Sequence, residues 1–586
     1  MNKIIPTAFL SLILLLQGGC GIDTPKAGSD AGDGRITLSV VGTNDVHGNI
    51  VERNGAGGLA LFGGYIANLR SVRAAGGGAV LLIDAGDMWQ GTLESNMAEG
   101  APVVAAYNAL EYGAATIGNH EFDFGPAGPA VIATQEGDDP RGALKARAAE
   151  AKYPFLAANL IDATTDAPVA WPNVRPSSRI EVAGITAGII GVTSRDTPAS
   201  TLAAHVKGLR VAALAETIRE QAEALRAAGA QLVIVTAHAG GRCDRFDDPA
   251  DLSSCEADSE IFGVARALPH GLVDLIVAGH VHKGLAHEVN GIAIISSWSG
   301  GEFFGRVDFR IDNGHIAARS IFPPQRICRY VVAGSGQCRG SAGTDGAVAA
   351  MYEGSVVRPD NAIARVIAPA IAEAGKLKAE KLGPHLETAI RRRPVPESPI
   401  GNLLTDILLA SEPRADVAIH NTLGGIRADL PAGDLTFGSV YEMFPFDNRI
   451  MHLEISGAEL KSVLANQVEG GIRRGHVSGV RVIADCDNEE LSLRVFDTDG
   501  REVRDEERLL VVTNDFLVTG GDSVLTPIMP EEGFDVVYEG AMVRDVIVEW
   551  MRQNAATLNE EQFNSEANPR WDLPRPAPLA CDLSAQ

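Results

Sequence analysis

The chain has 586 residues, of which 45% are hydrophobic and 21% are charged, and its formal net charge is −25. A folded chain of this length buries more than one core, so we expect more than one domain. The acidic balance argues against a nucleic-acid polymer as a partner, because nonspecific nucleic-acid binding depends on basic surface. An anionic substrate would need local positive charge, which bound metal ions can supply.

The N-terminus is typical of an export signal. Lys3 precedes the apolar stretch Ile4–Leu16, which is too short to span a bilayer with ease. Gly18-Gly19-Cys20 resembles a bacterial lipoprotein processing site, although Gln17 replaces the usual leucine. We therefore expect a signal peptide over 1–19, a lipidated Cys20 and a flexible tether over 20–34. The chain would be a periplasmic or cell-envelope lipoprotein anchored in the outer membrane; the alternative is ordinary signal cleavage with an incidental cysteine.

Between Arg35 and about Phe322, β-rich apolar runs alternate with helical segments, which predicts a layered α/β architecture. We expect a helix over Ala212–Ala228. The predicted strands are Ile36–Val41, Ala79–Asp84, Ala114–Ile117, Ile185–Val192, Leu232–Ala237 and Leu272–Ala278.

The second half of the chain is predicted to form a separate body. The Pro/Gly-rich stretch Pro323–Gly346 predicts a connection, and Ala362–Lys381 predicts an interdomain helix. From about His385 to Pro574 a smaller body follows. Its predicted strands are Asp416–His420, Ile450–Ile455 and Arg508–Thr513.

Six cysteines remain once Cys20 is set aside, and this even number favours disulfides in an oxidising compartment. No Cys-x-x-Cys spacing points to a structural zinc cluster. Proximity in sequence suggests the pairs Cys243/Cys255 and Cys328/Cys338, which leaves Cys486 and Cys581.

Five short segments supply oxygen and imidazole donors just beyond predicted strand ends, where α/β sheets usually place their sites. They contain five of the thirteen histidines. Two divalent ions about 3.5–4 Å apart can activate water and clamp a phosphoryl group, and their repulsion calls for a bridging carboxylate. Each segment alone is a weak signal, but five in order favour a binuclear site. The segments are Asp45-Val46-His47, Gly86-Asp87, Gly118-Asn119-His120-Glu121, His238 and Gly279-His280-Val281-His282.

The order and the residues of these segments resemble the motifs of the calcineurin-like metallophosphoesterase family. This resemblance implies an α/β/β/α domain. The resemblance implies that His120 lies over the phosphoryl group and that Asp123 orients it. Mixed His/Asp/Asn ligation suits Zn²⁺, Mn²⁺, Fe²⁺ or Co²⁺. One ion would bind Asp45, His47, Asp87 and His282, and the other Asp87, Asn119, His238 and His280, with Asp87 as the bridge.

The second body resembles the 5′-nucleotidase C-terminal domain, a smaller α/β substrate-binding domain. The matching stretches are Glu397–Asp406, Asn421–Arg427, Phe444–Asn448 and Thr513–Asp522. The resemblance implies that Phe446 and Phe516 stack on a nucleobase, Asp522 accepts bonds from ribose hydroxyls, Arg427 grips phosphate and Asn421 adds a polar contact. For each phenylalanine, core packing is the alternative. Two departures stand out: one extra residue between Asn421 and Arg427, and Ser523 in place of glycine. The resemblance also implies a phosphate-binding arginine shortly before Glu397, where the chain has Arg391–Arg393; a solvated basic run is the alternative.

Together the two resemblances point to the secreted bacterial 5′-nucleotidase and UDP-sugar hydrolase family. They imply an exported enzyme of nucleotide catabolism that converts nucleoside 5′-monophosphates to nucleoside and phosphate, with UDP-sugars as further substrates. The alternatives are a 2′,3′-cyclic-nucleotide phosphodiesterase with 3′-nucleotidase activity, a thiosulfohydrolase-like relative and a non-catalytic nucleotide-binding lipoprotein. We expect the metallophosphoesterase domain over 35–325, a connection with the interdomain helix over 326–384, the C-terminal domain over 385–575 and a tail over 576–586.

Overall fold

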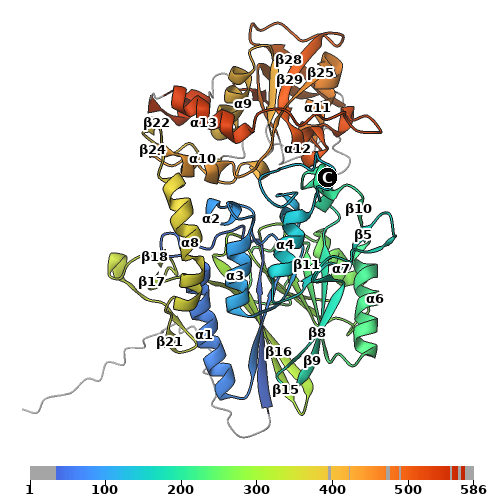
Figure 1. Ribbon diagram of the computed structural model, residues 1–586, viewed down its shortest axis with the longest axis vertical. Helices are drawn as coiled ribbons and strands as arrows, with labels where there is room; N and C mark the ends of the chain where they lie inside the picture. Colours follow the sequence, from blue (N-terminus) through green and yellow to red (C-terminus); the bar gives the residue numbers. More distant parts are fainter. Residues whose placement is uncertain are drawn as a thin grey trace, which may run out of the picture.

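The structure is a computed structural model that describes residues 35–392, 397–420, 423–469, 475–487, 490–554, 557–564 and 569–573. The predicted signal peptide, tether, Cys20 and C-terminal tail lie outside these residues. Two bodies are joined by the long helix α8 (Asn361–Lys378), as Figure 1 shows. Within the described ranges, no helix has both the length and the apolar character needed to cross a membrane.

Two large sheets form the centre of the N-terminal body. The first has the strand order β16 (His315–Arg326), β15 (Phe303–Asp312), β1 (Arg35–Thr43), β2 (Ala79–Asp84), β3 (Tyr112–Thr116), β4 (Phe155–Leu156) and β7 (Val174–Arg175). The second has the order β13 (Gly284–Val289), β14 (Ile292–Ser297), β12 (Leu275–Ala278), β11 (Leu232–His238), β9 (Ile185–Thr193) and β8 (Ser177–Val182).

The two sheets pack face to face, and helices cover their outer faces. One buried cluster joins Leu38 and Leu81 of the first sheet to Ile189 and Ile234 of the second. The helices α1 (Leu59–Ala75) and α3 (Ala101–Leu110) supply a second cluster, and α6 (Leu214–Ala227) and α7 (Glu260–Ala267) supply a third. Because each sheet buries both faces, its central strands are continuously apolar. The predicted α/β/β/α layering is confirmed.

Parallel pairing brings the carboxyl ends of the central strands to one edge of the molecule. β1, β2 and β3 are parallel neighbours, and so are β9, β11 and β12. The turns that follow these strands therefore converge, which is where α/β proteins build their sites.

The C-terminal body has a four-stranded sheet of order β25 (Ile450–Ser456), β29 (Arg508–Asn514), β23 (Val417–His420) and β26 (His476–Ser478). Buried residues of α9 (Pro399–Ser411) and α13 (Val543–Gln553) form one core cluster, and residues of α11 (Gly457–Glu469) belong to another. Two three-stranded sheets flank this arrangement: β24 (Gly433–Thr436), β22 (Lys381–Leu386) and β30 (Thr557–Leu558), and β28 (Glu490–Asp497), β27 (Val480–Asp487) and β31 (Trp571–Asp572).

The predicted connection Pro323–Gly346 is wrong in part, because β16 runs through its first residues to Arg326. It also contains the short strands β17 (Tyr330–Val332) and β18 (Cys338–Arg339). The predicted interdomain helix exists but ends at Lys378, since Lys381 already pairs in β22. At its start Asp360 caps the helix by accepting bonds from two backbone N–H groups.

Two disulfides, Cys243–Cys255 and Cys328–Cys338, confirm the two short-range pairs suggested by the sequence. Cys581 lies outside the described residues, so the third predicted pair stays a prediction.

Near the end of α8, Lys378 Nζ contacts Glu94 at 2.9 Å and Glu442 at 2.7 Å, which ties the helix to both bodies.

Candidate active site

One group of donors gathers Asp45, His47, Asp87 and His282 at the ends of β1, β2 and β12. His47 Nε2 lies 3.0 Å from His282 Nε2 and 3.9 Å from Asp87 Oδ2. His282 Nε2 lies 3.4 Å from Asp45 Oδ1. All four side chains therefore present ligand atoms to one small space.

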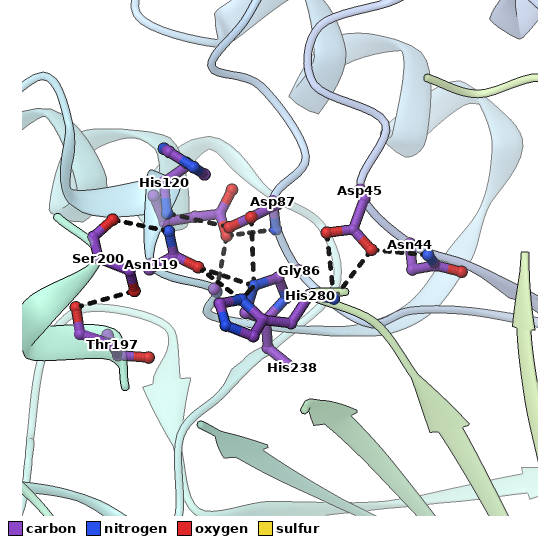
Figure 2. A network of polar contacts seen from close by, with 12 residues as sticks. Asn44, Asp45, Gly86, Asp87, Asn119, His120, Thr197, Ser200, His238 and His280 are labelled. Carbon is purple, nitrogen blue, oxygen red and sulfur yellow. Dashed lines mark hydrogen bonds and ion pairs between the residues drawn. The ribbon is translucent and has the colours of Figure 1, made fainter. Parts of the chain in front are cut away.

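A second group shares Asp87 with the first and adds Asn119, His238 and His280 (Figure 2). His238 Nε2 lies 3.2 Å from Asp87 Oδ2, 3.0 Å from Asn119 Oδ1 and 3.1 Å from His280 Nδ1. The structure thus brings together the seven side chains predicted as ligands, in the predicted partition.

The spacing of these donors fits metal ions. Donor atoms about 2.1 Å from one ion are separated by about 3.0 Å along the edge of an octahedron and about 3.4 Å along that of a tetrahedron. Most of the contacts above fall in that range. The donors are imidazole nitrogens, carboxylates and one carboxamide oxygen, a mixture that suits transition metals.

Backbone carbonyl groups fix the orientation of two of the imidazoles. His47 Nδ1 donates to the carbonyl of Gln90 at 2.9 Å, and His238 Nδ1 donates to the carbonyl of Ala85 at 2.8 Å. Because a carbonyl oxygen can only accept, each Nδ1 carries a hydrogen and each Nε2 faces the cluster.

The ligand loops adopt strained backbone. Five of the seven ligand residues have left-handed φ angles between 49° and 79°: Asp45, His47, Asp87, His280 and His282. Such conformations cost about 1–3 kcal/mol each and persist where the surroundings dictate them. Gly118 has a different constraint, since a Cβ there would lie 2.2 Å from Asp87 Oδ1.

Burial and neighbouring charges set the ionisation of the cluster. Burial and His238 lower the pKa of His280 to about 3, and burial and Arg427 hold the pKa of His47 well below its usual range. Burial opposes ionisation of Asp87, but His238 and His120 lower its pKa well below the ordinary value. Burial also disfavours a charged His238, yet the Asp87 carboxylate raises its pKa to about 10. A bound cation would take the place of that proton.

Glu121 holds the two ligand loops against each other. Its buried carboxylate accepts hydrogen bonds from the backbone N–H groups of Asp87 at 2.7 Å, Met88 at 2.8 Å and Gly118 at 2.7 Å. Burial raises the pKa of Glu121 to about 8. The residue belongs to a predicted motif, but its role in holding these loops was not foreseen.

His120 and Asp123 form a hydrogen-bonded pair beside the donors. His120 Nδ1 lies 2.6 Å from Asp123 Oδ2, and both residues belong to the turn around the short helix η1 (His120–Phe122). The backbone N–H of His120 donates to Asp87 Oδ1 at 2.9 Å, and the centre of its ring lies 5.3 Å from that of His47, so the imidazole lies beside the donor cluster. The predicted contact between these two residues is present.

A cavity of about 530 Å³ opens above the donors and extends into the C-terminal body. Four of the five predicted substrate-binding residues line it: Arg427, Phe446, Phe516 and Asp522. The guanidinium carbon of Arg427 lies 5.2 Å from the centre of the Phe446 ring. The fifth, Asn421, lies outside the described residues.

Several residues at the cavity carry contacts that the sequence did not reveal. The buried side chain of Gln90 donates from Nε2 to the carbonyl of Pro445 at 3.0 Å, across the two bodies. Asn448 lines the cavity and donates from Nδ2 to Asp515 Oδ1 at 3.1 Å. Arg392, one of the expected basic triplet, donates to the Arg427 carbonyl at 2.9 Å. The matched stretches Phe444–Asn448 and Thr513–Asp522 and the triplet Arg391–Arg393 offered a signal for some of these residues, whereas Gln90 had none.

Comparisons with known proteins agree with this arrangement. The profile of the family described as "5′-nucleotidase, C-terminal domain" matches residues 373–529. Protein UshA of Yersinia enterocolitica is 25% identical over 457 residues, which cover 74% of this chain and 76% of that protein. A 5′-nucleotidase of Vibrio cholerae is 24% identical over 489 residues, which cover 79% of this chain and 80% of that protein. The C-terminal body thus matches the 5′-nucleotidase C-terminal domain, and the chain is similar to 5′-nucleotidases over most of its length.

The fold of the chain also matches a solved structure. The 5′-nucleotidase precursor from Thermus thermophilus superimposes with a TM-score of 0.69 at 22% identity, over 92% of this chain and 100% of that one. The similarity of the chain to these proteins supports a hydrolase enzyme. Its described residues include two groups able to hold metal ions.

Proposed function

We propose that the protein is an exported phosphohydrolase with two divalent metal ions that cleaves nucleoside 5′-monophosphates to nucleoside and phosphate. The observation that carries the proposal is the meeting of two sites in one cavity. The paired donor groups share Asp87, and the aromatic and charged residues of the C-terminal body face the same space.

The N-terminal body would perform the hydrolysis. Asp45, His47, Asp87 and His282 would hold one ion, and Asp87, Asn119, His238 and His280 the other. When bound, the ions would supply an activated water and positive charge for the phosphoryl group. His120 would stabilise charge on that group and hand a proton to the leaving oxygen, while Asp123 keeps the imidazole oriented.

The C-terminal body would select the nucleotide. Phe446 and Phe516 would stack on the base, which contributes roughly 1–3 kcal/mol per ring in comparable single-strand sites. Asp522 would accept hydrogen bonds from the ribose hydroxyls, and Arg427 would bind the phosphate with its planar fork. Asn421 would add a polar contact. Binding energy from base and sugar would thus position the phosphate for attack.

We also propose the division of the chain into a metallophosphoesterase domain over 35–325, a connection over 326–384 and a substrate domain over 385–575. Export rests on the signal-like N-terminus and is supported by the two disulfides, which form in oxidising compartments. Lipidation of Cys20 would then place the enzyme in the cell envelope.

A substrate panel tests the proposed function. Protein lacking the residues before Gly34 would be loaded with Mn²⁺ or Zn²⁺ and assayed on AMP, UDP-glucose, 3′-AMP, 2′,3′-cyclic AMP and a thiosulfate-type substrate. We expect the highest kcat/KM on AMP or UDP-glucose, and loss of activity in His120→Ala. A higher kcat/KM on a cyclic or sulfur substrate would assign the chain to that alternative activity. If the metal-loaded protein binds AMP but cleaves no phosphoester, the chain is a nucleotide-binding protein without turnover.

A further inference from the structure

The loop of residues 194–202, which follows β9, lies beside the catalytic pair although it contains none of the five motifs. At its start, the backbone N–H of Ser194 donates to the carbonyl of His238 at 2.9 Å. At its end, Ser200 and Thr201 reach the segment that contains Asn119, His120 and Asp123. The loop is therefore fastened to the centre of the site at both ends.

Two polar contacts of this loop hold that segment. The carbonyl of Ser200 accepts a hydrogen bond from Asn119 Nδ2 at 2.9 Å, which turns Asn119 Oδ1 toward His238 and His280 (Figure 2). The hydroxyl of Thr201 donates to Asp123 Oδ1 at 3.0 Å. Thr201 is 3% exposed, and its contact with Asp123 lies at the wall of the cavity.

The remaining oxygen of Asp123 faces His120. Asp123 Oδ2 lies 2.6 Å from His120 Nδ1, while His120 Nε2 lies 2.7 Å from the Arg427 guanidinium. Arginine only donates, so in this contact Nε2 accepts and Nδ1 carries the hydrogen that faces Asp123. To pass a proton to the leaving oxygen, Nε2 must first take one from solvent when substrate displaces the guanidinium. The imidazole orientation thus depends on the rotation of one carboxylate, and Thr201 is the side chain that fixes the other oxygen of that carboxylate.

We propose that Thr201 is a positioning residue for His120, acting through Asp123. The inference rests on the proposed function, because it assigns Thr201 to the delivery of a proton to the leaving oxygen. Without the hydroxyl, the Asp123 carboxylate is free to rotate, and the imidazole loses the partner that directs Nε2 at the substrate. Metal binding does not depend on this bond.

Thr197 offers a matched control within the same loop. It is buried, and its hydroxyl lies 2.7 Å from the Thr193 hydroxyl rather than from the catalytic pair. Thr197→Val therefore removes an equivalent buried hydroxyl and reports the effect of loosening the loop. Thr201→Ser restores the hydroxyl lost in Thr201→Val.

The test compares wild type, Thr201→Val, Thr201→Ser and Thr197→Val on AMP, phenyl phosphate and 4-nitrophenyl phosphate, with metal content measured in parallel. Phenoxide is the more basic leaving group of the two aryl esters and depends more on a proton donor. We expect Thr201→Val to lower kcat on AMP and phenyl phosphate by about 10- to 100-fold, and on 4-nitrophenyl phosphate far less. Its KM and metal content should stay near wild type, and Thr201→Ser should recover most of the activity.

Three results would overturn the inference while leaving the proposed function intact. These are an equal loss of kcat on both aryl esters, a change in KM alone, and the same leaving-group dependence in Thr197→Val. A wild-type chain that releases phosphate from none of the three esters would overturn the proposed function and this inference together. Should Thr201→Val not fold, Thr201→Ala provides the same comparison.

Discussion

Arg427 of the C-terminal body donates from Nη2 to Nε2 of His120 in the N-terminal body, over a distance of 2.7 Å and a sequence separation of 307 residues. The guanidinium and the imidazole thus meet in the cavity above the candidate metal donors, where the proposed function puts the phosphate of a nucleotide. In the proposed function, a phosphate between them would accept hydrogen bonds from the guanidinium, and from Nε2 once that nitrogen carries a proton. The contact is therefore a direct physical link between the two bodies, and it joins the residues proposed for proton transfer and for phosphate binding.

Replacing Arg427 should separate charge from geometry. Arg427→Lys keeps a cation but loses the planar fork, and Arg427→Ala loses both. We expect kcat/KM on AMP to fall at least about tenfold for lysine and roughly a hundredfold or more for alanine. Arg481→Lys, which alters an ion pair with Asp572, is the matched control and should behave like wild type. Equal activities in all three variants would show that Arg427 does not bind the substrate.

Stacking should be visible as a dependence on the base. Phe446→Leu and Phe516→Leu should each reduce kcat/KM on AMP by about tenfold or more, because one ring contributes roughly 1–3 kcal/mol. Activity on ribose 5-phosphate, which has no base, should change little. Phe437→Leu removes a ring that packs in the C-terminal core instead of lining the cavity, and serves as the control. If both cavity variants lose activity equally on the two substrates, the rings support the fold rather than the base.

Removing metal should destabilise the N-terminal body as well as stop turnover. Ions that bind only the folded state raise stability by mass action, and the strained ligand loops depend on them. We expect dialysis against a chelator to lower Tm and readdition of Mn²⁺ or Zn²⁺ to restore it. Asp87→Asn should retain fewer than two ions per chain, whereas Asp139→Asn, which alters an ion pair with Lys145, should retain two. An unchanged metal content in Asp87→Asn would show that this carboxylate does not bridge.

Asp515 predicts a pH-dependent stability difference that does not involve the metal centre. Burial raises the pKa of Asp515 to about 6, and its Oδ2 has no hydrogen-bond partner among the described residues. A carboxyl group with a raised pKa binds more protons when folded, so wild-type stability falls as pH rises from about 4 to about 6. Asp515→Asn removes the charge and should be stabilised relative to wild type by up to about 3 kcal/mol at neutral pH.

Thermal unfolding of both proteins across this pH range measures the effect. The difference should vanish below about pH 4 and level off above about pH 7. Asp499→Asn, at an exposed turn, is the control and should follow wild type at every pH. A pH-independent difference between Asp515→Asn and wild type would mean that folding does not shift the pKa of Asp515.

The metal donors were predictable because each follows an apolar strand, and parallel strands bring their carboxyl ends together. His238 illustrates this: it is an isolated histidine in sequence, but the strand before it lies beside β12, which precedes His280. The layered fold followed from the same alternation of strands and helices.

Contacts that depend on long-range packing were not predictable. Thr201 and Asp123 are separated by 78 residues, and Gln90 and Pro445 by 355. Neither Thr201 nor Gln90 has a residue type that signals a role, since threonines and glutamines occur throughout the chain. The strands within the predicted connection were also missed, because Pro and Gly residues interrupt the periodicity that marks a strand.

The most direct test of the account is phosphate release from AMP, measured on one preparation as the number of bound metal ions per chain rises from none to two. The account predicts no release from the metal-free chain, full activity at two ions per chain and none from His120→Ala at the same loading. Release by the metal-free chain, or no release at two ions per chain, would contradict it.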